Sequence, residues 1–154
     1  MSISPSLKGF LDENKIDYQV IRHAPTDTSF NAARSAHVPT QCMVKGVLLR
    51  DDRGYLMAAV AATKSLDLEQ LNQQTGRTLQ LVEETELHGI LADCATGAVP
   101  ALGQAYGIPT VWDESLAYQP SFYIEAGDHK ELIRLGYYAF MGIMTENTRV
   151  ALSH

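Results

Sequence analysis

The sequence predicts a single α/β domain over residues 1–154, and three observations favour this fold class. The chain has 154 residues, 45% hydrophobic and 19% charged, which is enough apolar material for one core. Residues 43–62 have the pattern of a β-hairpin, and residues 68–75 are bounded by helix-capping residues. Strand and helix patterns follow one another to residue 144 without a repeat or a linker, as in α/β proteins.

The N-terminal part predicts a helix, a strand and a second helix. Ser4 is a suitable N-cap and Pro5 fits the first helical position, so we expect a helix that ends near Asn14. Residues 18–22 contain β-branched side chains and form the first expected strand. The alanine-rich residues 30–37 favour a short helix, which the following Val-Pro pair ends.

The clearest strand pattern covers residues 43–50. A turn that contains glycine joins it to a second run, residues 55–62, and together they predict a hairpin. Asp67 then has the position of an N-cap for a helix over residues 68–75. Gly76 is suited to end that helix, because glycine adopts positive φ without strain.

The second half of the chain predicts further strands and two helices. Leu87, Ile90 and Leu91 favour a short helix, and residues 137–144 favour an apolar one. The expected strands are residues 78–82, 108–112, 122–125 and 131–135. We expect the residues after Met144 to be frayed.

Residues 93–103 show neither a helical nor an alternating period, and we interpret them as a shaped loop around which the chain is organised. Gly97 and Gly103 permit backbone angles and close approaches that a Cβ prevents, and Pro100 fixes its own φ. Such a loop can present backbone N–H and C=O groups to a small ligand. A plain connection between a helix and a strand is the other interpretation, and composition does not separate the two.

Lys45 stands out in the strand pattern because alternation places it on one face with Met43, Val47 and Leu49. A lysine among large apolar residues either extends its ammonium to the rim of the sheet or holds it in a partly dry pocket. In the second case it would bind an anion or a polarised oxygen. The pattern leaves both outcomes open.

Charge and cysteine content limit the function classes. The net charge of −6 argues against a broad face for duplex DNA, although a partner that touches few phosphates remains compatible. Cys42 and Cys94 are expected to be free thiols in the cytoplasm. We find neither a leader pattern nor an apolar run long enough for a membrane span, so no membrane partner is expected.

The histidines are scattered without the spacing of a zinc site, so we expect no metal. The sequence contains neither GxGxxG nor GxxxxGK, and no cofactor is expected. Asp128 and His129 lie in a glycine-containing turn between strands, where they either form the turn or border a site. Cys94 is either a buried inert thiol or a nucleophile paired with a distant histidine, and no catalytic cysteine signature surrounds it.

Five motifs stand out when the sequence is taken as a whole: His23-Ala24-Pro25, Val44-Lys45-Gly46-Val47-Leu48-Leu49, Leu66-Asp67-Leu68, Gly97-Ala98-Val99-Pro100 and Ile124-Glu125-Ala126-Gly127-Asp128-His129. Taken together they resemble the YbaK family, which comprises aminoacyl-tRNA deacylase domains related to the editing insertion of bacterial prolyl-tRNA synthetase. The resemblance runs from about Leu7 to Met144. Thr96 replaces the leading glycine of the family's GxxxP-type loop, and the Asp93-Cys94 pair is similar to one subgroup.

The resemblance implies a curved, partly barrel-like mixed sheet surrounded by helices. It also implies a free-standing deacylase that removes a wrong amino acid from the 3′ CCA end of a tRNA, with a synthetase as a possible partner. Lys45 falls on the lysine that these enzymes require. The implied substrate-binding residues are His23, Thr96, Gly97, Ala98, Val99, Pro100, Gly127, Asp128 and His129.

An aminoacyl ester is already activated, so its hydrolysis needs positioning and charge stabilisation more than a strong base. Our hypothesis is that Lys45 anchors the terminal ribose or phosphate while N–H groups around Gly97 and Ala98 hold the carbonyl. Small aminoacyl groups such as alanyl are the expected substrates, because synthetases discriminate these poorly by binding alone. Two alternatives stay open, a non-catalytic module that binds a small ligand or an RNA end and a hydrolase that depends on Cys94.

Overall fold

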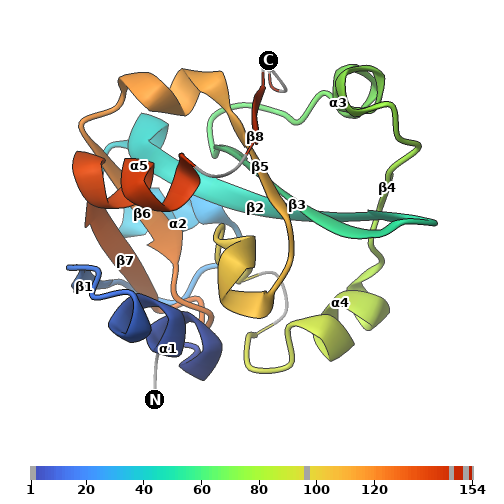
Figure 1. The fold of residues 1–154 in the computed structure, drawn as a ribbon. Helices are drawn as coiled ribbons and strands as arrows, with labels where there is room; N and C mark the ends of the chain where they lie inside the picture. Colours follow the sequence, from blue (N-terminus) through green and yellow to red (C-terminus); the bar gives the residue numbers. More distant parts are fainter. Residues whose placement is uncertain (1–2, 96–97, 146–147, 151–152, 154) are drawn as a thin grey trace.

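The computed structural model describes residues 3–95, 98–145, 148–150 and 153 (Figure 1). The α-helices are α1 (Pro5–Glu13), α2 (Ser29–Ser35), α3 (Leu68–Thr75), α4 (Glu84–Ile90) and α5 (Tyr137–Met144). The strands are β1 (Gln19–Arg22), β2 (Met43–Asp51), β3 (Gly54–Ala61), β4 (Gln80–Leu81), β5 (Thr110–Asp113), β6 (Ser121–Glu125), β7 (Glu131–Gly136) and β8 (Thr148–Val150). Short 3₁₀ helices are η1 (Thr40–Cys42), η2 (Gly103–Tyr106) and η3 (Glu114–Tyr118).

The strands form one mixed sheet in the order β1-β7-β6-β2-β3-β5-β8, and β4 pairs with β2 beside this path. The β2–β3 hairpin is antiparallel, whereas β2 pairs with β6 in parallel. The α/β class and the mixed sheet are therefore confirmed. β1 and β8 stand at opposite ends of the strand order, so the described strands leave the sheet open and the partly barrel-like form was wrong.

Local capping explains why the predicted helices form where they do. The Ser4 hydroxyl accepts a hydrogen bond from the Leu7 N–H at the start of α1, and Pro5 opens that helix. The Asp67 carboxylate accepts from the Gln70 N–H at the start of α3. Gly76 follows α3 with φ +66°, a conformation that glycine adopts at low cost.

The C-terminal part differs from the sequence-based expectation. Residues 148–150 form β8, which extends the sheet by pairing in parallel with β5, so the expectation of a frayed end was wrong for these three residues. The Arg149 guanidinium lies 5.6 Å from the centre of the Trp112 ring, a cation–π contact between these strands. The free edge of β5 supplies hydrogen-bonding partners that a reading of local pattern does not detect.

The two faces of the sheet are covered by different helices (Figure 1). α1 and α5 cover one face, where Leu7, Leu11 and Phe140 join the largest buried cluster. α2 covers part of the other face, where Ala32 and Ala33 pack in a separate cluster. Alternation along β2 divides its side chains between these faces, as the sequence predicts.

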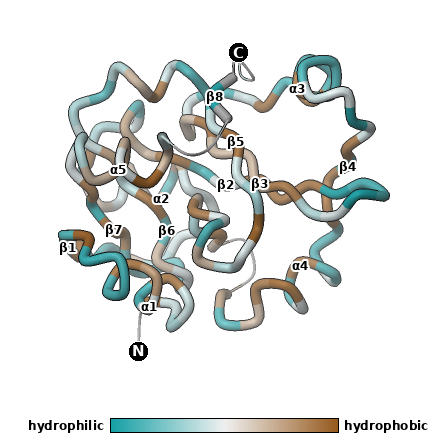
Figure 2. Tube along the Cα trace, viewed as in Figure 1, coloured by the Kyte–Doolittle hydropathy of each residue, from teal (hydrophilic) through white to brown (hydrophobic). Residues whose placement is uncertain are grey.

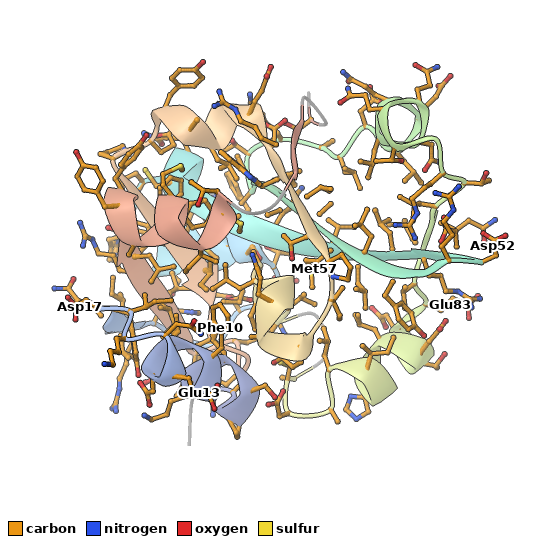
Figure 3. All side chains as sticks on the ribbon, in the orientation of Figure 1. Phe10, Glu13, Asp17, Asp52, Met57 and Glu83 are labelled. Carbon is orange, nitrogen blue, oxygen red and sulfur yellow. The ribbon has the colours of Figure 1, made fainter. Side chains whose placement is uncertain are left out.

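The β2–β3 hairpin is the longest feature of the sheet, and Asp52 lies at its far end (Figure 3). Figure 2 shows that this end is hydrophilic. β2 uses one edge for two partners, with Met43 and Val44 paired to β6 and Leu49 and Arg50 paired to β4. Between these pairings β2 pairs only with β3 among the described strands, so the sheet opens there. None of the described helices has the length and apolar character that a membrane crossing requires.

Candidate active site

Lys45 lies where this opening in the sheet begins, one residue beyond the last pair between β2 and β6. Met43 packs with Tyr123 and the α2 alanines, and alternation places Lys45 on the same face as Met43. The register of β3 also sets Lys45 opposite Val60. The lysine therefore leaves the sheet on the face that α2 covers.

The Lys45 side chain is half-buried, and this burial lowers the pKa of its ammonium. No ion pair or hydrogen bond joins Lys45 to another residue in the described part of the chain. A partly desolvated ammonium without a carboxylate partner is suited to bind an anion or an ester oxygen. The side chain is therefore partly withdrawn from water.

Glu125 is the neighbour of Lys45 on β6. The pairs Met43–Tyr123 and Val44–Ile124 are followed, one residue further along both strands, by Lys45 and Glu125. Glu125 is fully buried, and neither carboxylate oxygen has a hydrogen-bond partner among the described residues. Burial raises the pKa of Glu125 to about 7; His129 opposes this effect, and the Asp128 carboxylate adds to it.

His129 follows Glu125 after a tight turn and points back at it. Its Nδ1 lies 3.4 Å from the Glu125 Oε2, and its side chain is 15% exposed. Asp128 holds the turn, because its Oδ1 accepts hydrogen bonds from the N–H groups of Lys130 and Glu131. His129 itself has φ +62°, a left-handed conformation that a histidine adopts only where the surroundings require it.

Gly127 allows this turn to pack against the rest of the molecule. Its φ is +114°, and a Cβ at this position would lie 3.0 Å from the Ser4 Cβ and 3.3 Å from the Cys94 sulfur. Both the backbone angle and the close approach therefore require glycine. The Gly127 carbonyl also accepts a hydrogen bond of 2.7 Å from the Ala95 N–H, which ties the turn to the loop at residues 93–103.

His23 borders the same turn from the end of β1. Its N–H donates to the Lys130 carbonyl, and the N–H of Thr26 donates to the His129 carbonyl. The His23 Nδ1 lies 2.6 Å from the Ala24 carbonyl oxygen, while its Nε2 is buried without a hydrogen-bond partner among the described residues. The structure thus brings His23, Gly127, Asp128 and His129 together around one turn.

The loop at residues 93–103 behaves differently from the expectation. Thr96 and Gly97 lie outside the described residues. Ala98, Val99 and Pro100 are buried, and the Ala98 N–H already donates to the Ala95 carbonyl at 3.0 Å. This donor is therefore occupied, and the hypothesis that it holds a substrate carbonyl needs correction.

The loop also packs on the other face of β2 from Lys45. A Cβ on Gly46 would lie 3.1 Å from the Ala101 Cα and 3.2 Å from the Val99 Cγ1, so Gly46 faces this part of the loop. Adjacent residues of a strand point to opposite faces, and Lys45 thus points away from Val99. We expected Lys45 to point toward the loop that contains Gly97 and Pro100. Strand alternation shows that it does not point toward Val99 of that loop.

Asp93 and Cys94 belong to a hydrogen-bonded network on the α1 side. The Asp93 carboxylate accepts from the Ser4 hydroxyl at 3.0 Å, the Ser6 N–H at 2.8 Å and the Tyr106 hydroxyl at 2.8 Å. Burial raises the pKa of Asp93, but these hydrogen bonds outweigh it and hold the value at about 2. The network fixes the start of the loop against α1 and η2.

Cys94 is a buried free thiol, as is Cys42. Burial raises the pKa of Cys94 to about 11, and its sulfur lies 3.0 Å from the Tyr106 hydroxyl. At neutral pH this residue is therefore protonated and a poor nucleophile. This agrees with the inert thiol rather than with the nucleophilic cysteine.

The described residues contain no group of three or more His, Cys, Asp and Glu side chains that could hold a metal ion. The residue that the sequence reasoning missed is Glu125. Its signal was present, because alternation places it on the same face as Tyr123 and four residues before His129. The sequence does not reveal that a carboxylate at the end of an apolar strand is buried without a hydrogen-bond partner among the described residues.

Comparisons with known proteins agree with this fold. The sequence profile of the aminoacyl-tRNA editing domain matches residues 23–142. A candidate trans-editing enzyme for prolyl tRNA synthetase aligns with a TM-score of 0.85 at 23% identity, over 99% of both chains. A scaffold protein from computational epitope grafting aligns with a TM-score of 0.83 at 22% identity, also over 99% of both chains.

A candidate signal transduction protein from Marinobacter aquaeolei VT8 aligns with a TM-score of 0.76 at 22% identity, over 96% of this chain and 30% of that protein. No curated protein matches the sequence significantly. The structural likenesses establish the fold, and the profile match extends over most of the sequence. The chain belongs to the aminoacyl-tRNA editing domain family.

Proposed function

We propose that this protein is a trans-editing deacylase that removes a wrong, small amino acid from the 3′ CCA end of a tRNA. The observation that carries the proposal is the half-buried Lys45 ammonium of an editing domain, which has no counter-ion among the described residues and follows the β2–β6 pairing that leads toward the Gly127–His129 turn. One neighbour in fold is a candidate trans-editing enzyme for prolyl tRNA synthetase. This supports a synthetase as the source of the mischarged tRNA.

Hydrolysis of the aminoacyl ester requires the protein mainly to position the substrate and to stabilise charge. Water attacks the ester carbonyl carbon, the bond to the ribose oxygen breaks, and that oxygen takes a proton as the free amino acid leaves. Lys45 is placed to bind the terminal ribose or phosphate, and a hydroxyl of the substrate assists the water. A fixed cation near developing negative charge lowers the barrier without a strong base.

Specificity in this proposal comes from exclusion. The pocket would be bordered by His23 and the Gly127–His129 turn. Binding alone discriminates one methylene by roughly 10- to 200-fold, which leaves small amino acids as the errors that need editing. Alanyl-tRNA is therefore the first substrate to test.

The experiment is a panel of mischarged tRNAs incubated with the wild type, Lys45→Ala and the control Lys8→Ala. Lys8 lies on α1, exposed and paired with Asp12, far in sequence from the proposed site. We expect the wild type and Lys8→Ala to hydrolyse at least one small aminoacyl-tRNA, and Lys45→Ala to be slower by about 100-fold or more. Protection of every ester would show a binding module instead, and loss of activity on thiol alkylation would show a cysteine hydrolase.

A further inference from the structure

The buried carboxyl group of Glu125 is unusual in this molecule. Asp93 is half-buried and receives hydrogen bonds from Ser4, Ser6 and Tyr106. The buried Glu131 is paired with Arg22 at 3.1 Å through its Oε2, and only its Oε1 is without a hydrogen-bond partner among the described residues. Glu125 is fully buried, yet its two oxygens have no hydrogen-bond partner among the described residues. A buried carboxyl group in this state destabilises a fold, so stability does not explain its presence.

The surroundings of Glu125 connect it to the proposed site. Leu132 of β7 is its partner in the antiparallel register, and Lys45 is its neighbour on β2. The His129 Nδ1 lies 3.4 Å from the Glu125 Oε2. Glu125 has no exposed surface, whereas the His129 side chain retains some, so a substrate reaches the histidine first.

We propose that Glu125 is a positioning residue, which holds the His129 ring by its Nδ1 and thereby presents Nε2 to the aminoacyl ester beside Lys45. This inference rests on the proposed deacylase function. The carboxylate of Glu125 stabilises the protonated ring, and the protonated Nε2 donates a hydrogen bond to the ester oxygen as negative charge develops. Hydrogen bonds to a developing oxyanion are among the strongest catalytic contributions in acyl transfer.

Other charges around the pair set the pH at which it works. Asp128 lies in the same turn, Asp27 interacts electrostatically with His129, and Lys45 stands on the neighbouring strand. His23 borders the turn from β1, and β7 contributes the apolar Leu132. Burial raises the pKa of Glu125 to about 7, so the charge of this carboxyl group changes near neutral pH.

The left-handed backbone of His129 supports the same assignment. Its φ of +62° is strained for a histidine, and the Asp128 hydrogen bonds to Lys130 and Glu131 hold the turn in that form. This conformation directs the ring back over the end of β6 toward Glu125. Strain of this kind persists where the surrounding structure fixes it, often at functional sites.

The test compares the wild type with Glu125→Gln, His129→Asn, the double variant and the control Glu131→Gln. Glutamine keeps the size of Glu125 but cannot become an anion. Glu131 is a second buried carboxylate, paired with Arg22 on the other face of the sheet. Activity on the best substrate of the mischarged panel is measured as kcat and KM across pH.

We expect Glu125→Gln to lower kcat by about tenfold with KM within twofold, and to move the alkaline fall of kcat to lower pH. The double variant should be no slower than His129→Asn, because Glu125 acts through the histidine. Glu131→Gln should keep the wild-type profile. An unchanged pH profile in Glu125→Gln, or additive losses in the double variant, would overturn the proposal.

A second measurement does not depend on activity. In wild type, ¹⁵N signals of the His129 ring should show an inflection near pH 7 from the titration of Glu125, and Glu125→Gln should lack it. If no ester is hydrolysed but the inflection is present and lost in the variant, the deacylase function fails while the Glu125–His129 pair stands. If wild type is active and the inflection is absent from both proteins, the positioning role fails while the function stands.

Discussion

The two sides of the sheet treat two carboxyl groups, one half-buried and one fully buried, in opposite ways. On the α1 side, three donors surround Asp93 and hold its pKa at about 2. On the α2 side, Glu125 is left without a hydrogen bond among the described residues, and burial raises its pKa to about 7. The Asp93 carboxylate thus stabilises the fold through its hydrogen bonds, whereas the burial of the Glu125 carboxylate destabilises it.

This difference teaches where to look for function in a fold of this kind. Buried polar groups are normally hydrogen-bonded, and an exception needs a cause. Unbonded buried atoms in the described chain include the His23 Nε2, the Thr26 Oγ1 and the Glu125 oxygens, and all three residues lie on or against the Gly127–His129 turn. The surroundings of this turn therefore have polar groups that a bound ligand can pair with.

The largest expected effect comes from removing the charge of Lys45 and keeping its aliphatic stem. Lys45→Met should lower kcat/KM by about 100-fold, about 3 kcal/mol of transition-state stabilisation, because only the ammonium is lost. Deacylation kinetics on the best mischarged tRNA measure it. Near-normal activity in Lys45→Met would place the chemistry elsewhere and remove the distinction between the two faces.

The next largest effect concerns the turn that joins the faces. Gly127→Ala should destabilise the protein by about 2–3 kcal/mol, because a Cβ meets Ser4 and the backbone has positive φ. Urea denaturation measures the loss, and Gly142→Ala in α5 is the control. Gly142 has open space around its Cβ position, so that variant should be neutral or slightly stabilising. Equal free energies of unfolding for Gly127→Ala and Gly142→Ala would contradict the tight packing of the turn.

Asp93→Asn should have a smaller effect that depends on pH. A carboxylate whose pKa is lowered on folding stabilises the protein above about pH 4, and this contribution is lost as pH falls toward about 2. We expect Asn to cost about 1–2 kcal/mol at pH 7 and less at about pH 2.5. Denaturation curves of the wild type and Asp93→Asn at both pH values measure this cost. A stability difference that does not change with pH would show that the charge of Asp93 plays no part.

The smallest effect has the opposite sign. A carboxyl group whose pKa is raised on folding contributes stability below about pH 4.5 and loses it as pH rises through about 7. Glu125→Gln should therefore stabilise the protein by about 1 kcal/mol at pH 8 and change little at pH 4. Thermal unfolding at the two pH values measures the difference. If Glu125→Gln were instead less stable than the wild type at pH 8, the Glu125 carboxylate would stabilise the fold as Asp93 does.

Local pattern predicted most of the fold. α3 was predicted with its bounds, because Asp67 and Gly76 cap it through their own side chain and backbone. α5 and the β2–β3 hairpin follow equally from local periodicity. β8 was missed, because only the distant edge of β5 makes Thr148–Val150 a strand.

The site was predictable in part, and mainly through the family resemblance. Alternation placed Lys45 on a face with Met43, but it did not say which face the loop at Val99 packs on. The pairing of β2 with β6, which sets Lys45 beside Glu125, joins residues 80 positions apart and has no local signal. The missing hydrogen bonds of Glu125 are likewise a property of the assembled fold.

The central claim is that the aminoacyl group binds on the α2 side. NMR titration with an amide-linked, non-hydrolysable 3′-aminoacyl-adenosine tests it most directly, because the ligand reports its own position. We predict the largest shift changes at Lys45, α2 and the Gly127–His129 turn. Changes centred on Ser4, Asp93 and Tyr106, with Lys45 unaffected, would contradict the account.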